Sequence, residues 1–152
     1  MLHFYGILAL EKYERNYRFI QKGCKEIKHP EAISYNDEIW TMDFHGSLVE
    51  KEKGENLLLE KSKFYENDRE YLIALYSLLA EKVVNYISRD SFLLLDNGKE
   101  VYIHNNEALY CERDKNGDIN LSSDSCLLHG ERYSKLKKHS SLLFYNNNLK
   151  TL

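Results

Sequence analysis

The chain is poor in the residues that interrupt or cross-link a polypeptide. Its 152 residues include one proline, seven glycines and three cysteines. So little proline and glycine argues against long linkers and low-complexity tails. The cysteines Cys24, Cys111 and Cys126 are odd in number and form no C-x-x-C pair, so neither a zinc knuckle nor a thioredoxin-type redox pair is indicated. Reduced thiols in a cytoplasm are expected, with a Cys111–Cys126 bridge as the alternative.

Motifs of several enzyme classes are also missing. There is no G-x-G-x-x-G, no G-x₄-G-K-[ST] and no G-x-S-x-G, so the corresponding nucleotide-dependent enzymes and hydrolases are not indicated. The D-K-N-G-D stretch at 114–118 does not place Gly and Glu where a calcium loop needs them, and is read as a hairpin turn. The six histidines form no metal-binding pair, so no metal and no cofactor is expected. They are His3, His29, His45, His104, His129 and His139.

No segment is long and apolar enough to suggest a membrane span. The apolar start of the chain covers only residues 1–10, whereas a span needs about 20 residues. It lacks the basic region and cleavage site of a signal peptide. We therefore expect a soluble, cytoplasmic chain that folds as one globular domain over residues 1–152, with about the last six residues frayed.

Charge is distributed unevenly along the sequence. The net charge is −3, but residues 31–70 hold eleven acidic and five basic side chains, whereas residues 131–152 hold one acidic and five basic side chains. The basic C-terminal segment could contact phosphate, but the acidic middle makes the protein a poor general nucleic-acid binder. The acidic segment is better suited to a basic protein partner, because opposite charges speed association.

Hydrophobic periodicity predicts two main helices. Leu10, Tyr13, Tyr17 and Ile20 follow three- and four-residue steps, which predicts an amphipathic helix over about 8–27, or a strand at 2–9 before a shorter helix. A nearly all-round apolar run predicts the central helix at about 68–88, with Asn67 as its N-cap.

Between and after these helices the pattern indicates antiparallel strands. Strands are expected at 39–49 and 57–64 around a turn at 53–56, on both sides of Asn97-Gly98, at 109–113 and at 119–121. Asn-Gly between apolar runs is a strong hairpin signal, and a type I′ turn needs positive φ at both positions. The sequence therefore predicts an α+β fold: a largely antiparallel sheet of about five to six strands with two helices packed on it.

The D-F-H-G-S segment at 43–47 resembles a catalytic triad in its letters. In a strand Asp43, His45 and Ser47 share one face in a row, too far apart for a nucleophile and its base to meet. Trp40, Met42 and Phe44 would form the buried face, so the polar residues are interpreted as the solvated one. Gly46 falls on the apolar side, where a missing side chain allows a close approach.

These observations favour a non-enzymatic protein-binding or inhibitory module, such as an immunity protein that neutralises a toxin. Its acidic, tyrosine-rich surface would bind another protein, which we expect to be basic. The residues expected to bind are Asp43, His45, Glu50, Glu52 and Glu55. One alternative is a small hydrolase or nuclease that uses His45 or His104 with carboxylates such as Asp43. Another is a homodimeric structural or regulatory module joined through an exposed strand edge.

Overall fold

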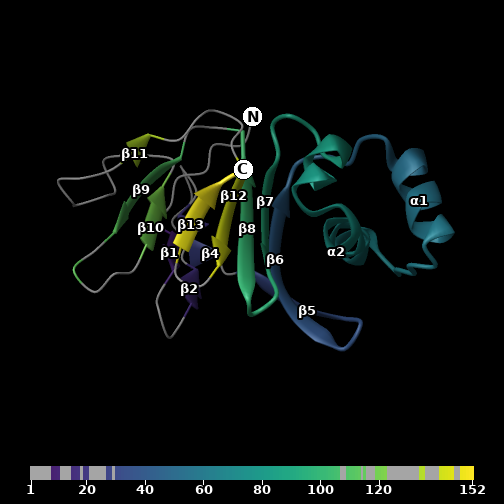
Figure 1. Ribbon diagram of the computed structural model, residues 1–152, viewed down its shortest axis with the longest axis horizontal. Helices are drawn as coiled ribbons and strands as arrows, with labels where there is room; N and C mark the ends of the chain where they lie inside the picture. The colour runs from purple at the N-terminus through teal and green to yellow at the C-terminus, as the bar shows by residue number, and fades with distance from the viewer. Residues whose placement is uncertain are drawn as a thin grey trace.

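A computed structural model gives the architecture of the chain. It describes residues 8–10, 15–17, 19–20, 27–28, 30–106, 109–113, 115, 119–122, 134–135, 141–145 and 148–152. The described elements form three layers: helices, a six-stranded sheet, and a five-stranded sheet on the side away from the helices (Figure 1). The predicted α+β class with a largely antiparallel sheet is confirmed.

The central layer is the six-stranded sheet, whose neighbouring strands all pair antiparallel. Its order is β13-β12-β8-β7-β6-β5. The strands are β5 (Glu31–Tyr35), β6 (Glu38–His45), β7 (Phe92–Asp96), β8 (Glu100–Asn105), β12 (Ser141–Tyr145) and β13 (Asn148–Thr151). Strands β7 and β8 lie in the middle of this order and are almost wholly buried.

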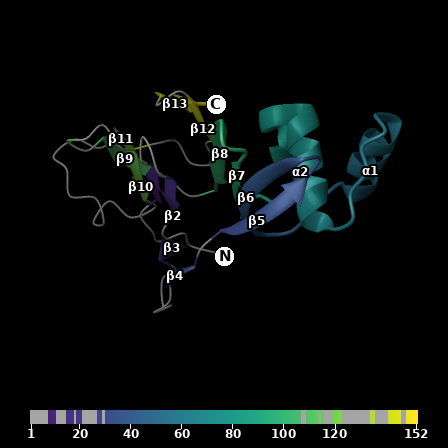
Figure 2. The ribbon, with the colours of Figure 1, turned by 90° about the horizontal axis from the view of Figure 1, so that it is seen from below.

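Three helical segments cover one face of this sheet. They are α1 (Lys51–Glu60), α2 (Asp68–Leu79) and the 3₁₀ segment η1 (Ala80–Tyr86). Helix α2 is buried on all sides from Tyr71 to Tyr76 because it lies between the sheet and α1 (Figure 2). Its hydrophobic contacts include Trp40, Met42, Leu93 and Tyr102 from the sheet. The central helix predicted at about 68–88 is therefore confirmed for α2, and η1 continues it to Tyr86.

The second sheet packs on the opposite face of the first. Its order is β11-β9-β10-β1-β2, and a separate hairpin pairs β3 with β4. These strands are β1 (Leu8–Leu10), β2 (Arg15–Tyr17), β3 (Phe19–Ile20), β4 (Ile27–Lys28), β9 (Tyr110–Arg113), β10 (Ile119–Ser122) and β11 (Ser134–Lys135). A second core joins the layers, with Ile119 and Leu121 of β10 packed among Phe92, Leu94 and Ile103.

The predicted helix over about 8–27 is wrong. The described residues of this segment form β1 to β4, and Leu8 and Leu10 pair with Leu121 and Ile119 of β10. The three- and four-residue spacing of apolar residues is a local signal for a helix. Pairing of β1 with the distant strand β10 outweighs this local helical preference.

The predicted strand at 57–64 and the turn at 53–56 are also wrong, because α1 occupies this stretch. Gly54 and Leu58 are its buried residues, and their spacing of four places both on one helical face. A Cβ on Gly54 would lie 3.0 Å from the Cζ of Tyr71, so glycine allows α1 to approach α2 closely.

The predicted β-hairpin at Asn97-Gly98 is confirmed by the pairing of β7 with β8. Its turn is different from the expected one, because Gly98 has positive φ but Asn97 does not. The two-residue turn with both φ positive instead joins β5 to β6, at Asn36 and Asp37. Strand β13 pairs with β12 at the edge of the six-stranded sheet. Among the described residues, no helix has the length and apolar character needed to cross a membrane.

Candidate functional site

Several polar side chains gather at one end of the six-stranded sheet. At this end β6 and β8 finish, and their neighbours β7 and β12 begin. His45, His104 and Ser141 lie here, together with the loop at Ser88–Ser91 that leads into β7.

The two histidines of this end lie on opposite faces of the sheet. His45 pairs with Phe92, and His104 pairs with the next residue, Leu93. Because neighbouring residues of a strand point to opposite faces, His104 faces the helices and His45 faces the second sheet. The two histidines predicted for a hydrolase or nuclease therefore do not meet in one site.

Asp43 and His45 do contact each other. Asp43 Oδ2 lies 2.9 Å from His45 Nε2, and both side chains are partly buried. The side chains lean together along the strand, which the expected spacing did not anticipate. Ser47 is exposed, and its backbone N–H donates to Ser88 Oγ at 3.0 Å.

A pocket of about 420 Å³ opens on the helical face of this sheet end. Its lining comes from η1, from the loop after η1 and from β8: Val84, Asn85, Ile87, Ser88, Arg89 and His104. Val84 and Ile87 contribute apolar side chains to the lining, and the other four residues carry an amide, a hydroxyl, a guanidinium and an imidazole group. This mixture is typical of a site for a small polar ligand.

Ser141 and Tyr102 orient the side chain of His104. Its Nδ1 lies 3.1 Å from Ser141 Oγ, and the same oxygen lies 2.9 Å from the hydroxyl of Tyr102. All three residues are buried. Burial raises the pKa of Tyr102 to about 12, so its hydroxyl keeps its proton at neutral pH.

Ser88 fixes the loop that carries Arg89. Its Oγ accepts from Ser47 N–H, donates to Asp90 Oδ1 at 2.8 Å, and lies 2.8 Å from Ser91 Oγ. Ser88 N–H donates to the Ser47 carbonyl at 2.8 Å. The side chain and the backbone of Ser88 therefore both bond to Ser47, which lies just after β6. These bonds hold the backbone next to Arg89.

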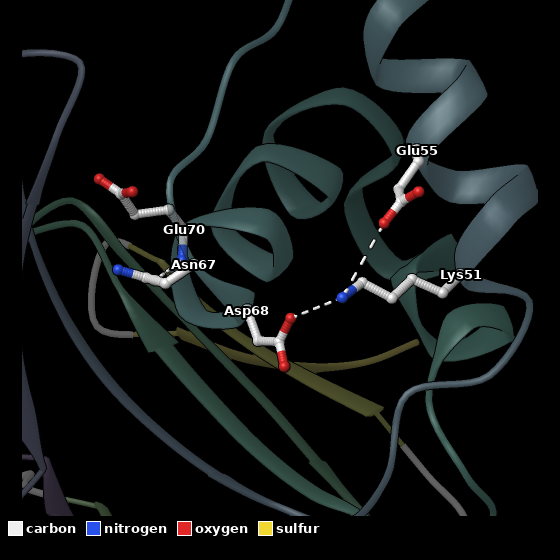
Figure 3. Close-up of polar contacts among 5 residues, drawn as sticks. All are labelled: Lys51, Glu55, Asn67, Asp68 and Glu70. Atoms are coloured by element: carbon white, nitrogen blue, oxygen red, sulfur yellow. Dashed lines mark hydrogen bonds and ion pairs between the residues drawn. The ribbon is translucent and has the colours of Figure 1, made fainter.

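A second polar cluster joins the two helices (Figure 3). Lys51 Nζ lies 2.9 Å from Asp68 Oδ1 and 3.9 Å from Glu55 Oε1. The hydrogen bond to Asp68 raises the pKa of Lys51. All three side chains are exposed, so the cluster connects α1 to the first turn of α2 at the protein surface.

The residues predicted to bind a partner do not form one surface. Glu50 precedes α1, and Glu52 and Glu55 lie within it, on the helical side of the sheet. Asp43 and His45 lie on the face toward the second sheet. A protein partner, and a binding role for these five residues, therefore stay predictions.

Sequence reasoning missed most of the pocket. Asn85, Ser88 and Arg89 were assigned no role, and Ser141 lies in a segment whose structure was left open. No motif connects His104 with the segment 84–89 that provides the other lining residues. The one signal was His104 at the end of a predicted hairpin strand.

Comparison with solved structures identifies enzymes of the same fold. The chain is similar to glutamine phosphoribosylpyrophosphate (PRPP) amidotransferase from B. subtilis complexed with ADP and GMP, at 14% identity and a TM-score of 0.56 over 91% of this chain and 33% of that one. It is also similar to the allosteric regulatory enzyme of purine biosynthesis, at 14% identity and a TM-score of 0.56 over 81% and 30% of the two chains. The chain thus spans about a third of the length of these enzymes.

No known protein family and no curated protein matches the sequence. At 14% identity, the likeness to the two enzymes shows a shared fold. The prediction of a non-enzymatic immunity-type or inhibitory protein is wrong, because these two solved structures of the same fold are enzymes, one of them a glutamine PRPP amidotransferase.

Proposed function

We propose that the chain is a glutamine amidotransferase-type domain that binds glutamine and hydrolyses its side-chain amide to glutamate and ammonia. The observation that carries this proposal is the fold, which matches the PRPP amidotransferase over 91% of this chain. The chemistry of the pocket lining supports it. As the cysteine content suggests, we place this activity in the cytoplasm.

The pocket offers a complementary group for each polar end of glutamine. Arg89 can bind the α-carboxylate, since a guanidinium pairs with a carboxylate through two parallel hydrogen bonds. The side-chain oxygen of Asn85 can accept from the α-ammonium group, and His104 lines the same pocket. Ligand pockets usually measure about 300–1,000 Å³, so 420 Å³ suits a single amino acid.

Two measurements on the purified chain test the proposal. Calorimetry would measure glutamine binding, with asparagine and glutamate as comparison ligands, and a coupled assay would measure ammonia and glutamate. We expect glutamine to bind in preference to asparagine, because a site that fits glutamine loses contacts with a side chain one methylene shorter. We also expect ammonia and glutamate in equal amounts.

Replacing Arg89 connects the binding to this pocket. Arg89→Ala should weaken glutamine binding by about 10- to 100-fold, as expected for a lost charged hydrogen bond. Lys82→Ala is the matched control, since Lys82 is an exposed cation of η1 outside the pocket lining. If the chain neither binds glutamine nor releases ammonia, the proposed function is wrong. If Arg89→Ala and Lys82→Ala weaken glutamine binding equally, glutamine does not bind in this pocket.

A further inference from the structure

Strand β5 forms an open edge of the six-stranded sheet. It is the last strand in the sheet order, so it pairs with β6 on one side and with no described strand on the other (Figure 1). Three of its five residues are exposed. The open side of an edge strand carries backbone N–H and C=O groups that can pair with a further strand, and proteins usually protect such edges.

The turn between β5 and β6 shows which residues of the strand bond to each other. Asn36 and Asp37 both have positive φ, as in the type I′ turn of a two-residue hairpin. In this turn the carbonyl of Tyr35 accepts from the N–H of Glu38, and these two residues are paired in the ladder. Hydrogen-bonded and non-hydrogen-bonded pairs then alternate along an antiparallel ladder.

This alternation gives the direction of each backbone group in β5. Glu31, Ile33 and Tyr35 direct their N–H and C=O groups toward β6, whereas Ala32 and Ser34 direct theirs to the open side. Among the described residues, no hydrogen bond outside the β5–β6 ladder uses the backbone of Ala32 or Ser34. Two donors and two acceptors therefore face outward from this edge.

The usual protection of an edge strand is missing from β5. At the other edges, β2 and β11 have only three and two residues, and β13 carries the exposed Lys150. The sequence of β5 is E-A-I-S-Y, without lysine, proline or glycine. Its one charged residue, Glu31, forms an ion pair with Arg69 of α2. Short length, lysine and proline are the devices that discourage edge pairing, so β5 is the edge most open to a partner strand.

A second copy of β5 complements this edge. If two copies pair antiparallel about a twofold axis at Ile33, Ala32 of each copy lies opposite Ser34 of the other. The outward groups of these residues then form two hydrogen-bonded pairs, with four hydrogen bonds in total. Pro30 before the strand and the turn at Asn36 limit its length, so this register aligns the two strands over all five residues.

The side chains of the helical face also fit this register. Ile33 is partly buried against the main core, and it would meet Ile33 of the partner subunit in a non-hydrogen-bonded pair, where side chains come closest. Glu31 would lie opposite Tyr35 of the partner subunit. The two Glu31 carboxylates are then about 13 Å apart along the strands, beyond the screening length of about 8 Å at physiological salt. The register thus pairs apolar side chains and separates like charges.

We propose that β5 is a homodimer interface, in which two copies of the chain pair their β5 strands antiparallel about a twofold axis at Ile33 and join their six-stranded sheets into one. The partner is a second copy because the strand is its own complement, and twofold dimers with one patch shared by both subunits are the commonest oligomers. No residue that lines the pocket lies in β5, so the interface is independent of glutamine binding.

Sedimentation equilibrium of the whole chain tests the interface. The wild type should show a monomer–dimer equilibrium between about 1 µM and 1 mM. Ala32→Pro should abolish the dimer and leave the monomer folded, because it removes an N–H that faces outward, and proline is tolerated at such edge positions. Ser34→Lys should weaken the dimer by about tenfold or more, since the two lysines become diagonal neighbours about 7–8 Å apart. Asn56→Lys adds the same charge at an exposed position of α1 and is the control.

Cysteine cross-linking tests the register. Ile33→Cys places two thiols opposite each other, with their Cβ atoms about 4.5–5.5 Å apart, near the separation that a disulfide needs. Oxidised glutathione should therefore cross-link this variant rapidly. Ala32→Cys is the matched control, because its thiols would be diagonal neighbours and should cross-link slowly. The wild type shows how much cross-linking comes from the three native cysteines.

Circular dichroism and thermal unfolding show whether each variant is folded. A wild type that stays monomeric up to about 1 mM would overturn the proposal. So would a dimer that Ala32→Pro and Ser34→Lys leave intact, because the interface would then lie elsewhere. Equal cross-linking of Ile33→Cys and Ala32→Cys would refute the twofold axis at Ile33. None of these results depends on whether the chain binds glutamine.

Discussion

The backbone of Gly46 lies directly against the side chain of Ser91. A Cβ atom on Gly46 would be 2.7 Å from the Cβ of Ser91 and 3.0 Å from its Cα, closer than real side chains come. Gly46 also has a φ of 143°, a conformation that side-chain-bearing residues rarely adopt. The end of β6 therefore meets the start of β7 only because residue 46 has no side chain, and this contact sets the position of the Ser88 loop beside the pocket.

Gly46→Ala should be among the most destabilising single changes in the chain. Overpacking and backbone strain each cost about 1–3 kcal/mol, so we expect the free energy of unfolding to fall by about 3 kcal/mol or more. Gly98→Ala is the control, because Gly98 also has positive φ but nothing lies within 4 Å of its added Cβ. It should cost about 1 kcal/mol. Urea denaturation of both variants measures the difference, and equal costs would contradict the close contact.

The sequence predicted a close approach at Gly46, but it did not indicate that Ser91 is the residue in contact. Alternation of apolar and polar residues predicted Gly46 on the apolar side of a strand, where a close approach is possible. In the structure Gly46 follows β6 directly and is exposed, but its backbone does lie against Ser91. Ser91 is the last residue before β7, and no local pattern marks it as the contact. Periodicity reports which side of an element is buried, but not what lies against it.

The same limit explains the errors in the helical layer. Leu57, Leu58 and Leu59 fit a strand or a helix equally well, and only packing of Gly54 and Leu58 against α2 selects α1. The pocket could not be predicted for the same reason, since no local pattern shows that His104 of β8 and the segment 84–89 line one pocket. Two local signals were confirmed, namely the N-cap at Asn67 and the hairpin at Asn97-Gly98, whereas the turn predicted at 53–56 was wrong.

Asn67→Ala tests the best of these local signals. Asn67 Oδ1 accepts from the backbone N–H of Glu70 at 3.0 Å, as the capping pattern predicts, although Glu70 Oε2 accepts from Glu66 N–H and not from the cap itself. Loss of the cap should lower the free energy of unfolding by about 1 kcal/mol. Asn67→Asp should retain most of it. Asn56→Ala, an exposed position inside α1, should change stability by less than about 0.5 kcal/mol.

Tyr71→Phe should be harmless or stabilising, although Tyr71 is fully buried. Its hydroxyl has no hydrogen-bond partner among the described residues, so the folded protein carries the full cost of removing it from water. Phenylalanine keeps the ring contact with Tyr65 and removes that cost. Tyr102→Phe breaks a bond to Ser141 and should cost about 1 kcal/mol. Thermal unfolding compares the two, and a larger loss at Tyr71 would show that its hydroxyl is bonded.

Buried tyrosines should make the fold sensitive to alkali. Burial raises the pKa of Tyr71 and of Tyr102 to about 12, and burial together with nearby Glu100 raises the pKa of Tyr76 further. In the unfolded chain, tyrosine loses its proton near pH 10. Between about pH 10 and 12 the folded state therefore holds more protons than the unfolded state, and the free energy of unfolding falls as the pH rises.

Urea denaturation at several pH values between about 9 and 11.5 measures this slope. The Tyr71→Phe/Tyr102→Phe double variant should show a shallower fall than the wild type, because two of the groups that take part are gone. Tyr145→Phe, which removes an exposed hydroxyl, should leave the slope unchanged. A slope equal in all three proteins would mean that Tyr71 and Tyr102 ionise in the folded state as readily as in the unfolded chain, and the burial of both hydroxyls would then be refuted.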